Sequence, residues 1–154
     1  MKFIFILLIF LFSNVAYAES FDHLKQSSWN VTPKVLICKD SGVSLDTAAR
    51  AVSFWNDMGF KVSSPVLSDC EDDTTTGHII IKRDPGDIFQ VFYNGATVVH
   101  LFRNTKTISH ADVYVNKTLV DQVDVLKHEI GHAVGLEDER EISSSVMVYR
   151  KAYR

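Results

Sequence analysis

The chain has 154 residues, a formal net charge of −3 at pH 7 and a hydrophobic fraction of 46%. Its length and composition indicate one globular domain with a sizeable core, which argues against a disordered or multidomain chain. No stripe of lysine and arginine runs along the sequence, and this argues against a protein that binds nucleic acid.

The N-terminal segment has the order of a secretory signal peptide. Lys2 precedes an apolar run at residues 3–12, and Ala16-Tyr17-Ala18 offers a small-residue cleavage site. A membrane anchor is the alternative, but ten apolar residues are short against the about 20 needed to span a bilayer. We therefore expect a signal peptide at 1–18 and a single domain at 19–154. The mature chain would be secreted, periplasmic or extracellular, without membrane contact.

The first half of this domain predicts one helix between strands. Residues 19–30 are polar and predict a loose arm, and residues 33–38 predict a strand that begins at Pro33. A helix is expected at 44–58, capped by Ser44 and ended by Gly59. Its apolar positions recur at helical spacing: Leu45, Ala48, Ala49, Val52 and Trp55. Residues 61–67 and 78–82 are expected to be strands.

The second half predicts a hairpin, a further strand and a second helix. Asn94-Gly95 is typical of a hairpin turn between strands at 89–93 and 96–102. Residues 108–116 alternate apolar and polar side chains as a strand does, and residues 119–134 predict a helix. The layout is α+β, with helices packed on one mainly antiparallel or mixed sheet.

The chain contains two cysteines, Cys38 and Cys70. Export would place them in an oxidising compartment, where a disulfide between them is expected. The alternative is a free thiol that blocks a metal site in a latent form.

The segment His128-Glu129-Ile-Gly-His132 lies in the second predicted helix. Histidines four residues apart fall on one helix face, so both imidazoles can reach one metal ion. A zinc site for hydrolysis needs three protein ligands and an open position for water. The two histidines supply two ligands, and the Glu129 carboxylate can take a proton from the attacking water.

The third ligand is expected just after this helix. Gly135 allows a left-handed residue at the helix end and a sharp turn, after which Asp138 can return to the metal. Glu137 is the rival ligand, one position out of register. The other charges nearby, Glu139 and Arg140 among them, are expected in a solvated loop.

Together these positions resemble the metzincin zinc peptidases. Their signature is His-Glu-x-x-His-x-x-Gly-x-x-(His or Asp), followed by a turn that contains methionine. The chain has this register from His128 to Asp138, and Ser145-Val-Met147-Val-Tyr149 resembles the methionine turn. The chain is similar to matrixin-like members in the short gap before the turn. Residues 108–116 resemble the family's edge strand above the cleft, and residues 44–58 its backing helix.

The resemblance implies a fold and roles for single residues. The fold would be a twisted mixed sheet with a backing helix, an active-site helix and a minimal C-terminal subdomain. His128, His132 and Asp138 would bind one catalytic Zn²⁺, and Glu129 would be the general base. Tyr149 would bind the zinc or stabilise the oxyanion. Met147 would lie beneath the metal as a hydrophobic floor.

The implied function is that of a monomeric, zinc-dependent endopeptidase whose partner is a protein or peptide substrate. Two alternatives stay open: a zinc-containing binding or inhibitory module, and a zinc hydrolase of a non-peptide amide. Some matrixin-like proteins bind a second zinc through upstream histidines. His100 and His110 are interpreted here only as strand residues, and His23 as part of the arm.

Overall fold

The computed structural model describes residues 21–70, 76–84, 95–116, 123–140 and 145–148. The predicted signal peptide at 1–18, the predicted strand at 89–93 and Tyr149 lie outside these residues. No helix within the described ranges has the length and apolar character needed to cross a membrane.

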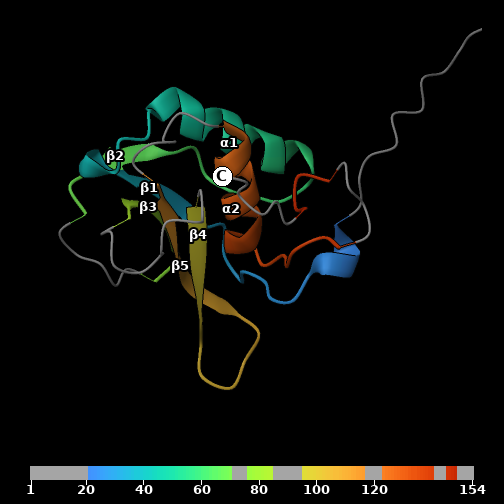
Figure 1. Ribbon diagram of the computed structural model, residues 1–154. Coiled ribbons are helices and arrows are strands. Elements are labelled where there is room, and N and C mark those ends of the chain that lie inside the picture. The colour runs from blue at the N-terminus through green and yellow to red at the C-terminus, as the bar shows by residue number, and fades with distance from the viewer. Residues whose placement is uncertain (1–20, 71–75, 85–94, 117–122, 141–144, 149–154) are drawn as a thin grey trace, which may run out of the picture.

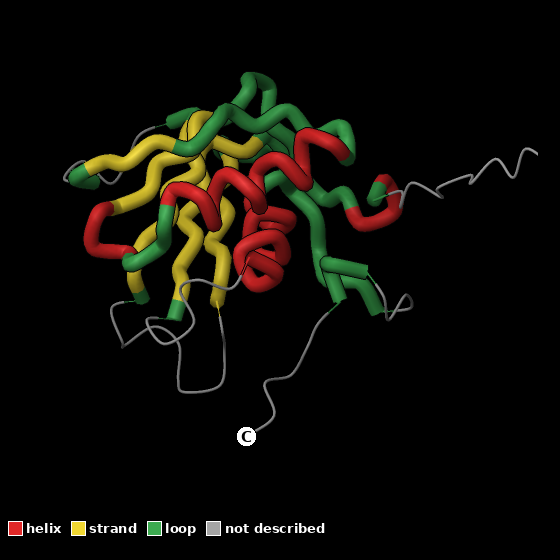
Figure 2. The backbone as a smooth tube through the Cα atoms, turned by 90° about the horizontal axis from the view of Figure 1, so that it is seen from above, coloured by secondary structure: helices red, strands yellow, loops and turns green. Residues whose placement is uncertain are grey.

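The described residues form a five-stranded mixed sheet with two α-helices packed on one face (Figures 1 and 2). The strands are β1 (Lys34–Cys38), β2 (Val66–Ser68), β3 (His78–Arg83), β4 (Gly95–Leu101) and β5 (Ile108–Val115). The helices are α1 (Leu45–Asp57) and α2 (Val123–Ala133), with short 3-10 turns at Asp22–Leu24 and Lys39–Ser41. The expected α+β class is confirmed.

The sheet has the order β2-β1-β3-β5-β4. Strands β1, β2, β3 and β5 run parallel, and only β4 runs antiparallel, against β5. The prediction was a mainly antiparallel or mixed sheet, and the sheet is mixed, with parallel pairs in the majority. The physical reason is that α1 follows β1 as a crossover, which returns the chain to the same end of the sheet.

The predicted limits of α1 hold, but its buried face differs: Leu45 and Ala49, two of the five predicted apolar positions, are exposed, whereas Thr47 and Ala51 are buried. The Ser44 side chain accepts a hydrogen bond from the Thr47 amide at 3.1 Å, which caps α1 as expected. Gly59, with φ of +90°, follows the end of α1. The start predicted for the second helix, at residue 119, lies outside the described part. Its observed end, Ala133, falls one residue short of the prediction.

The core lies between the sheet and the helices. Trp55 of α1 is fully buried, and its indole donates to the Lys127 carbonyl of α2 at 2.8 Å. The strands supply the other wall through a set of buried apolar residues: Val35, Ile37, Ile79, Ile81, Ala111 and Val113. This packing fixes α2 across the sheet, and α2 carries the candidate site.

The prediction of a loose arm at 19–30 is wrong for the described residues 21–30. Phe21 and Leu24 are buried in the core, and the Trp29 indole donates to the Ala133 carbonyl at 2.9 Å. Three apolar residues spread over ten positions are too few to produce a periodic pattern, although together they anchor the segment. The arm therefore packs against the C-terminal end of α2.

Two further features concern the ends of the sheet. Cys38, at the end of β1, is joined to Cys70 by a disulfide, so the latent-thiol alternative is wrong.

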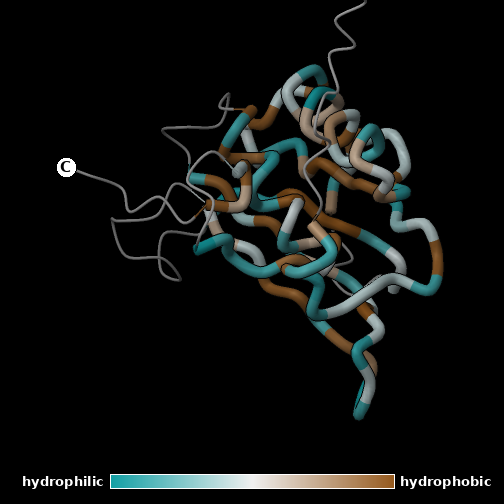
Figure 3. The backbone as a smooth tube through the Cα atoms, turned by 90° about the vertical axis from the view of Figure 1, so that its right-hand side faces the viewer, coloured by the Kyte–Doolittle hydropathy of each residue, from teal (hydrophilic) through white to brown (hydrophobic). Residues whose placement is uncertain are grey.

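Gly95, predicted in a turn, instead begins β4. The connection between β4 and β5 projects from the sheet, and its tip is hydrophilic (Figure 3).

Candidate metal centre

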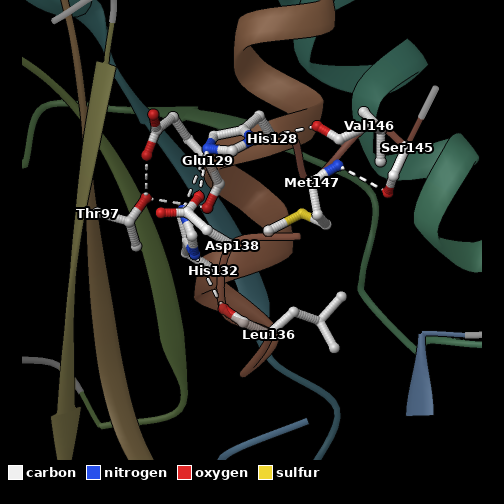
Figure 4. A network of polar contacts seen from close by, with 9 residues as sticks. All are labelled: Thr97, His128, Glu129, His132, Leu136, Asp138, Ser145, Val146 and Met147. Atoms are coloured by element: carbon white, nitrogen blue, oxygen red, sulfur yellow. Dashed lines mark hydrogen bonds and ion pairs between the residues drawn. The ribbon is translucent and has the colours of Figure 1, made fainter. Parts of the chain in front are cut away.

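Helix α2 brings His128 and His132 together as their spacing predicts. Their Nε2 atoms lie 3.2 Å apart, and the two rings meet edge to face with centroids 4.7 Å apart (Figure 4). The opposite face of α2 is held in the core by Leu126 and Ile130, which are 1% and 0% exposed. The buried apolar stripe therefore sets the rotation of the helix and turns the imidazoles toward the cleft.

Gly135 makes the turn after α2. Its φ is +102°, a conformation that favours glycine, and a Cβ there would overlap the Ser27 carbonyl of the arm. The Gly135 carbonyl accepts a hydrogen bond from the Gln26 amide at 2.9 Å. The arm thus supports the turn that returns the chain to the histidines.

After this turn Asp138, and not Glu137, reaches the histidines. Asp138 Oδ1 lies 3.3 Å from His128 Nε2 and 3.4 Å from His132 Nε2. The Glu137 carboxylate is exposed and accepts a hydrogen bond from the side-chain amide nitrogen (Nε2) of Gln26 at 3.1 Å. The structure therefore brings together His128, His132 and Asp138, whereas the carboxylate of Glu137 is not part of this group.

The three donor atoms have the spacing of a tetrahedral metal site. Ligands about 2.0–2.1 Å from a zinc ion at tetrahedral angles are about 3.3–3.4 Å from one another. The three observed separations are 3.2, 3.3 and 3.4 Å. The donor set of two imidazoles and one carboxylate also suits Zn²⁺, so these residues fit the ion.

The hydrogen bonds around the rings strengthen this fit. His128 Nδ1 lies 3.0 Å from the Val146 carbonyl, and His132 Nδ1 lies 2.9 Å from the Leu136 carbonyl (Figure 4). A carbonyl oxygen only accepts, so each Nδ1 donates a hydrogen to it, and each Nε2 is left as the ring atom that can bind a metal. Asp138 Oδ1 is buried and has no hydrogen-bond partner among the described residues. The three atoms that face one another, Nε2 of His128, Nε2 of His132 and Oδ1 of Asp138, can therefore all donate electron pairs to one bound cation.

The methionine segment packs beneath α2. Met147 is fully buried, and a Cβ on Gly131 would overlap its sulfur atom. The Met147 amide donates to the Ser145 hydroxyl at 3.2 Å, which forms a tight turn. This turn places the Val146 carbonyl against His128, so it also orients a candidate ligand.

Glu129 lies beside the triad, with its side chain directed at β4. It is 5% exposed, and burial raises the pKa of its carboxyl group above the usual value. A hydrogen bond from Thr97 opposes this shift: Thr97 Oγ1 lies 2.8 Å from Glu129 Oε2 (Figure 4). Thr97 was not singled out from the sequence. The sequence carries no local signal for it, because its contact with Glu129 depends on how β4 packs against α2.

A cleft of about 1160 Å³ runs between β4 and α2 and contains the triad and Glu129. Its β4 wall includes Gly95, Thr97 and Val99. The strand expected at the edge, residues 108–116, is instead the second strand, β5. Strand β4 forms the edge of the sheet beside the cleft, because it pairs antiparallel with β5 on the side of β5 that faces away from β3.

A second group of donors lies on the other face of the sheet. His100 and His110 stack with ring centroids 4.0 Å apart, and with Asp112 their donor atoms lie within 4.8 Å of one another. The sequence interpretation treated these histidines as strand residues outside any metal site, and the pairing of β4 with β5 brings them together. The Lys82 ammonium group contacts Asp112 Oδ1 at 3.1 Å, so a positive charge already faces this carboxylate. Burial, followed by the nearby His100, lowers the pKa of His110.

Glu139 and His23 also differ from expectation. Glu139 was expected in a solvated loop but is 4% exposed, and His23 Nε2 lies 2.7 Å from its Oε2. The Glu139 amide donates to the Met147 carbonyl at 2.8 Å. The arm and the methionine turn are therefore both tied to the residue directly after Asp138.

Comparison with known proteins adds no assignment. No protein-family model matches the chain, and no curated protein matches it significantly. A function for the chain is therefore inferred from the geometry of the site and from the sequence pattern.

Proposed function

We propose that the chain is a secreted zinc-dependent endopeptidase of the metzincin type. The observation that carries the proposal is the triangle of His128 Nε2, His132 Nε2 and Asp138 Oδ1, with sides of 3.2–3.4 Å. The turn of Met147 beneath α2 and the position of Glu129 beside the triad support it. The N-terminal sequence pattern supports export.

His128, His132 and Asp138 would hold the ion. Zinc bound there would act as a Lewis acid toward the scissile carbonyl and the attacking water. Asp138 brings a negative charge where a third histidine would bring none, which would make a bound zinc ion a slightly weaker Lewis acid.

The Glu129 carboxylate performs the proton transfers. It accepts a proton from the attacking water and then donates it to the leaving amine. Tyr149 is proposed to stabilise the oxyanion, and it lies outside the described residues.

The cleft favours an extended substrate. Strand β4 forms one wall, and its edge is not paired with another described strand. A peptide laid along β4 can form main-chain hydrogen bonds with it, which is recognition by strand addition. Main-chain pairing needs a run of peptide units, and this favours peptides over isolated amides.

A peptide-library digest with and without a chelator tests this proposal. We expect cleavage by the zinc-loaded chain, loss of cleavage on chelation and its return with zinc. Glu129→Gln keeps the size of the side chain but removes the base, so it should retain zinc and lose cleavage by at least about 100-fold.

Retained turnover in Glu129→Gln would contradict the mechanism. Zinc binding by the wild type without cleavage of any peptide would favour the binding or inhibitory module. Cleavage only of non-peptide amides would favour the second alternative.

A further inference from the structure

One face of β4 makes a fitted contact with the side chain of Glu129. Gly95 and Thr97 stand two residues apart on this strand and pair with Val115 and Val113, which are buried on the core face. Side chains two apart on a strand share a face. Both residues of β4 therefore face α2, and Glu129 lies against them.

Thr97 contacts two oxygens of the same residue. Its Oγ1 lies 2.8 Å from Glu129 Oε2 and 2.9 Å from the main-chain carbonyl of Glu129 (Figure 4). A threonine hydroxyl has one hydrogen to donate and also accepts, whereas the main-chain carbonyl only accepts. The hydroxyl can therefore donate to the carboxylate. Its single hydrogen can be directed to either the carboxylate or the carbonyl, and both oxygens lie within hydrogen-bond distance.

Gly95 supplies the room for this arrangement. A Cβ built on Gly95 would lie 2.8 Å from Cγ and 3.0 Å from Oε1 of Glu129. Real Cβ atoms do not approach other atoms so closely, so a side chain at residue 95 would displace the Glu129 carboxyl group. This is a positional requirement for glycine that comes from close approach, since no φ in the left-handed region is involved.

We propose that Thr97 is the positioning residue for Glu129, with Gly95 providing the space that the carboxyl group occupies. The proposal rests on the proposed function, because it assigns Thr97 a role toward the general base. Thr97 acts through Glu129 and is not itself placed on the reacting atoms. Strand β4 would then both border the substrate cleft and set the orientation of the base.

The activity test compares Thr97→Val, Thr97→Ser and Gly95→Ala in the zinc-loaded chain. Thr97→Val keeps the shape but removes the hydroxyl, and we expect kcat to fall about 10–100-fold with zinc content and KM unchanged. Thr97→Ser keeps the hydroxyl and should restore kcat to within about threefold of the wild type. Gly95→Ala should lower kcat although Thr97 is intact.

A matched control lies at the next position of the same strand. Val98 is 39% exposed and pairs with Asp112, on the face away from α2. Val98→Thr replaces a methyl group by a hydroxyl, the opposite of the change in Thr97→Val, and should leave kcat unchanged. An unchanged kcat in Thr97→Val, or a Thr97→Ser variant as impaired as Thr97→Val, would overturn the proposal.

A second test does not depend on activity. Unfolding midpoints are measured without metal for the wild type, Thr97→Val, Glu129→Ala and the double variant. Thr97→Val should lower the midpoint less in the Glu129→Ala background, because the buried carboxyl group that needs the hydroxyl is gone. Equal shifts in both backgrounds would refute the contact.

The two tests separate this proposal from the proposed function. A wild type that binds zinc without cleaving peptides would count against the peptidase. The unfolding comparison would then still decide whether Thr97 holds Glu129.

Discussion

At the scale of single residues, Asp138 and Glu137 show how a turn selects between neighbours. Both carry carboxylates and both could follow the helix to a metal. The turn at Gly135 directs Asp138 Oδ1 to within 3.4 Å of both imidazoles, whereas Glu137 is exposed and bonds Gln26. The register of the signature pointed to Asp138, and the placement of its side chain agrees with that choice.

The third ligand can be tested by a matched pair of variants. Asp138→Ala removes one of three donors and should lose most bound zinc after dialysis, with a loss in affinity of at least about 100-fold. Glu137→Ala removes an adjacent carboxylate that contacts Gln26 and should keep the zinc. Elemental analysis of both proteins measures the outcome, and the reverse pattern would assign the ligand to Glu137.

Other residues of the site could not be predicted from local sequence. Thr97 lies 32 positions from Glu129 in the chain, so their contact depends on how β4 packs against α2. His23 and Glu139 are 116 positions apart. A charge run is usually solvated, and the burial of Glu139 is made tolerable by its contacts with the distant His23 ring and the adjacent Arg140 amide.

At the scale of elements, the helix with the histidines was the most predictable part. Its signal is local: apolar residues at helical spacing, two histidines four apart, and a glycine at the end. Strand pairing was less predictable because it is set by distant segments. The run Ile79-Ile80-Ile81, at most 1% exposed on either face, is typical of a central parallel strand and was the available signal.

The turn after α2 provides a prediction at this scale. Gly135 has a φ of +102° and Gly59 a φ of +90°. Replacing either by alanine places a side chain in this strained conformation and should lower the free energy of unfolding by about 1–2 kcal/mol. Only at Gly135 would the new Cβ also overlap the Ser27 carbonyl, whereas Gly59 has open space around it. Gly135→Ala should therefore also weaken zinc binding, because Asp138 follows this turn.

Chemical unfolding and zinc titration of the two variants provide the comparison. Equal stability losses with unchanged zinc affinity in both would show that the arm does not support the ligand turn.

At the scale of the whole molecule, the sheet separates two clusters of donors. The triad lies in the cleft on the face of the sheet that α2 covers, where Asp138 has no lysine or arginine partner among the described residues. His100, His110 and Asp112 lie on the opposite face, where Lys82 faces the carboxylate. Two groups of similar composition thus differ in the charge that surrounds them, and we expect only the triad to bind zinc tightly.

Calorimetric titration of zinc into the metal-free chain is the most direct test of the metal centre. We expect one equivalent for the wild type and loss of this binding in His132→Ala, with His110→Ala as a control that keeps it. Absence of zinc binding in the wild type, or undiminished binding in His132→Ala, would contradict the assignment of the site.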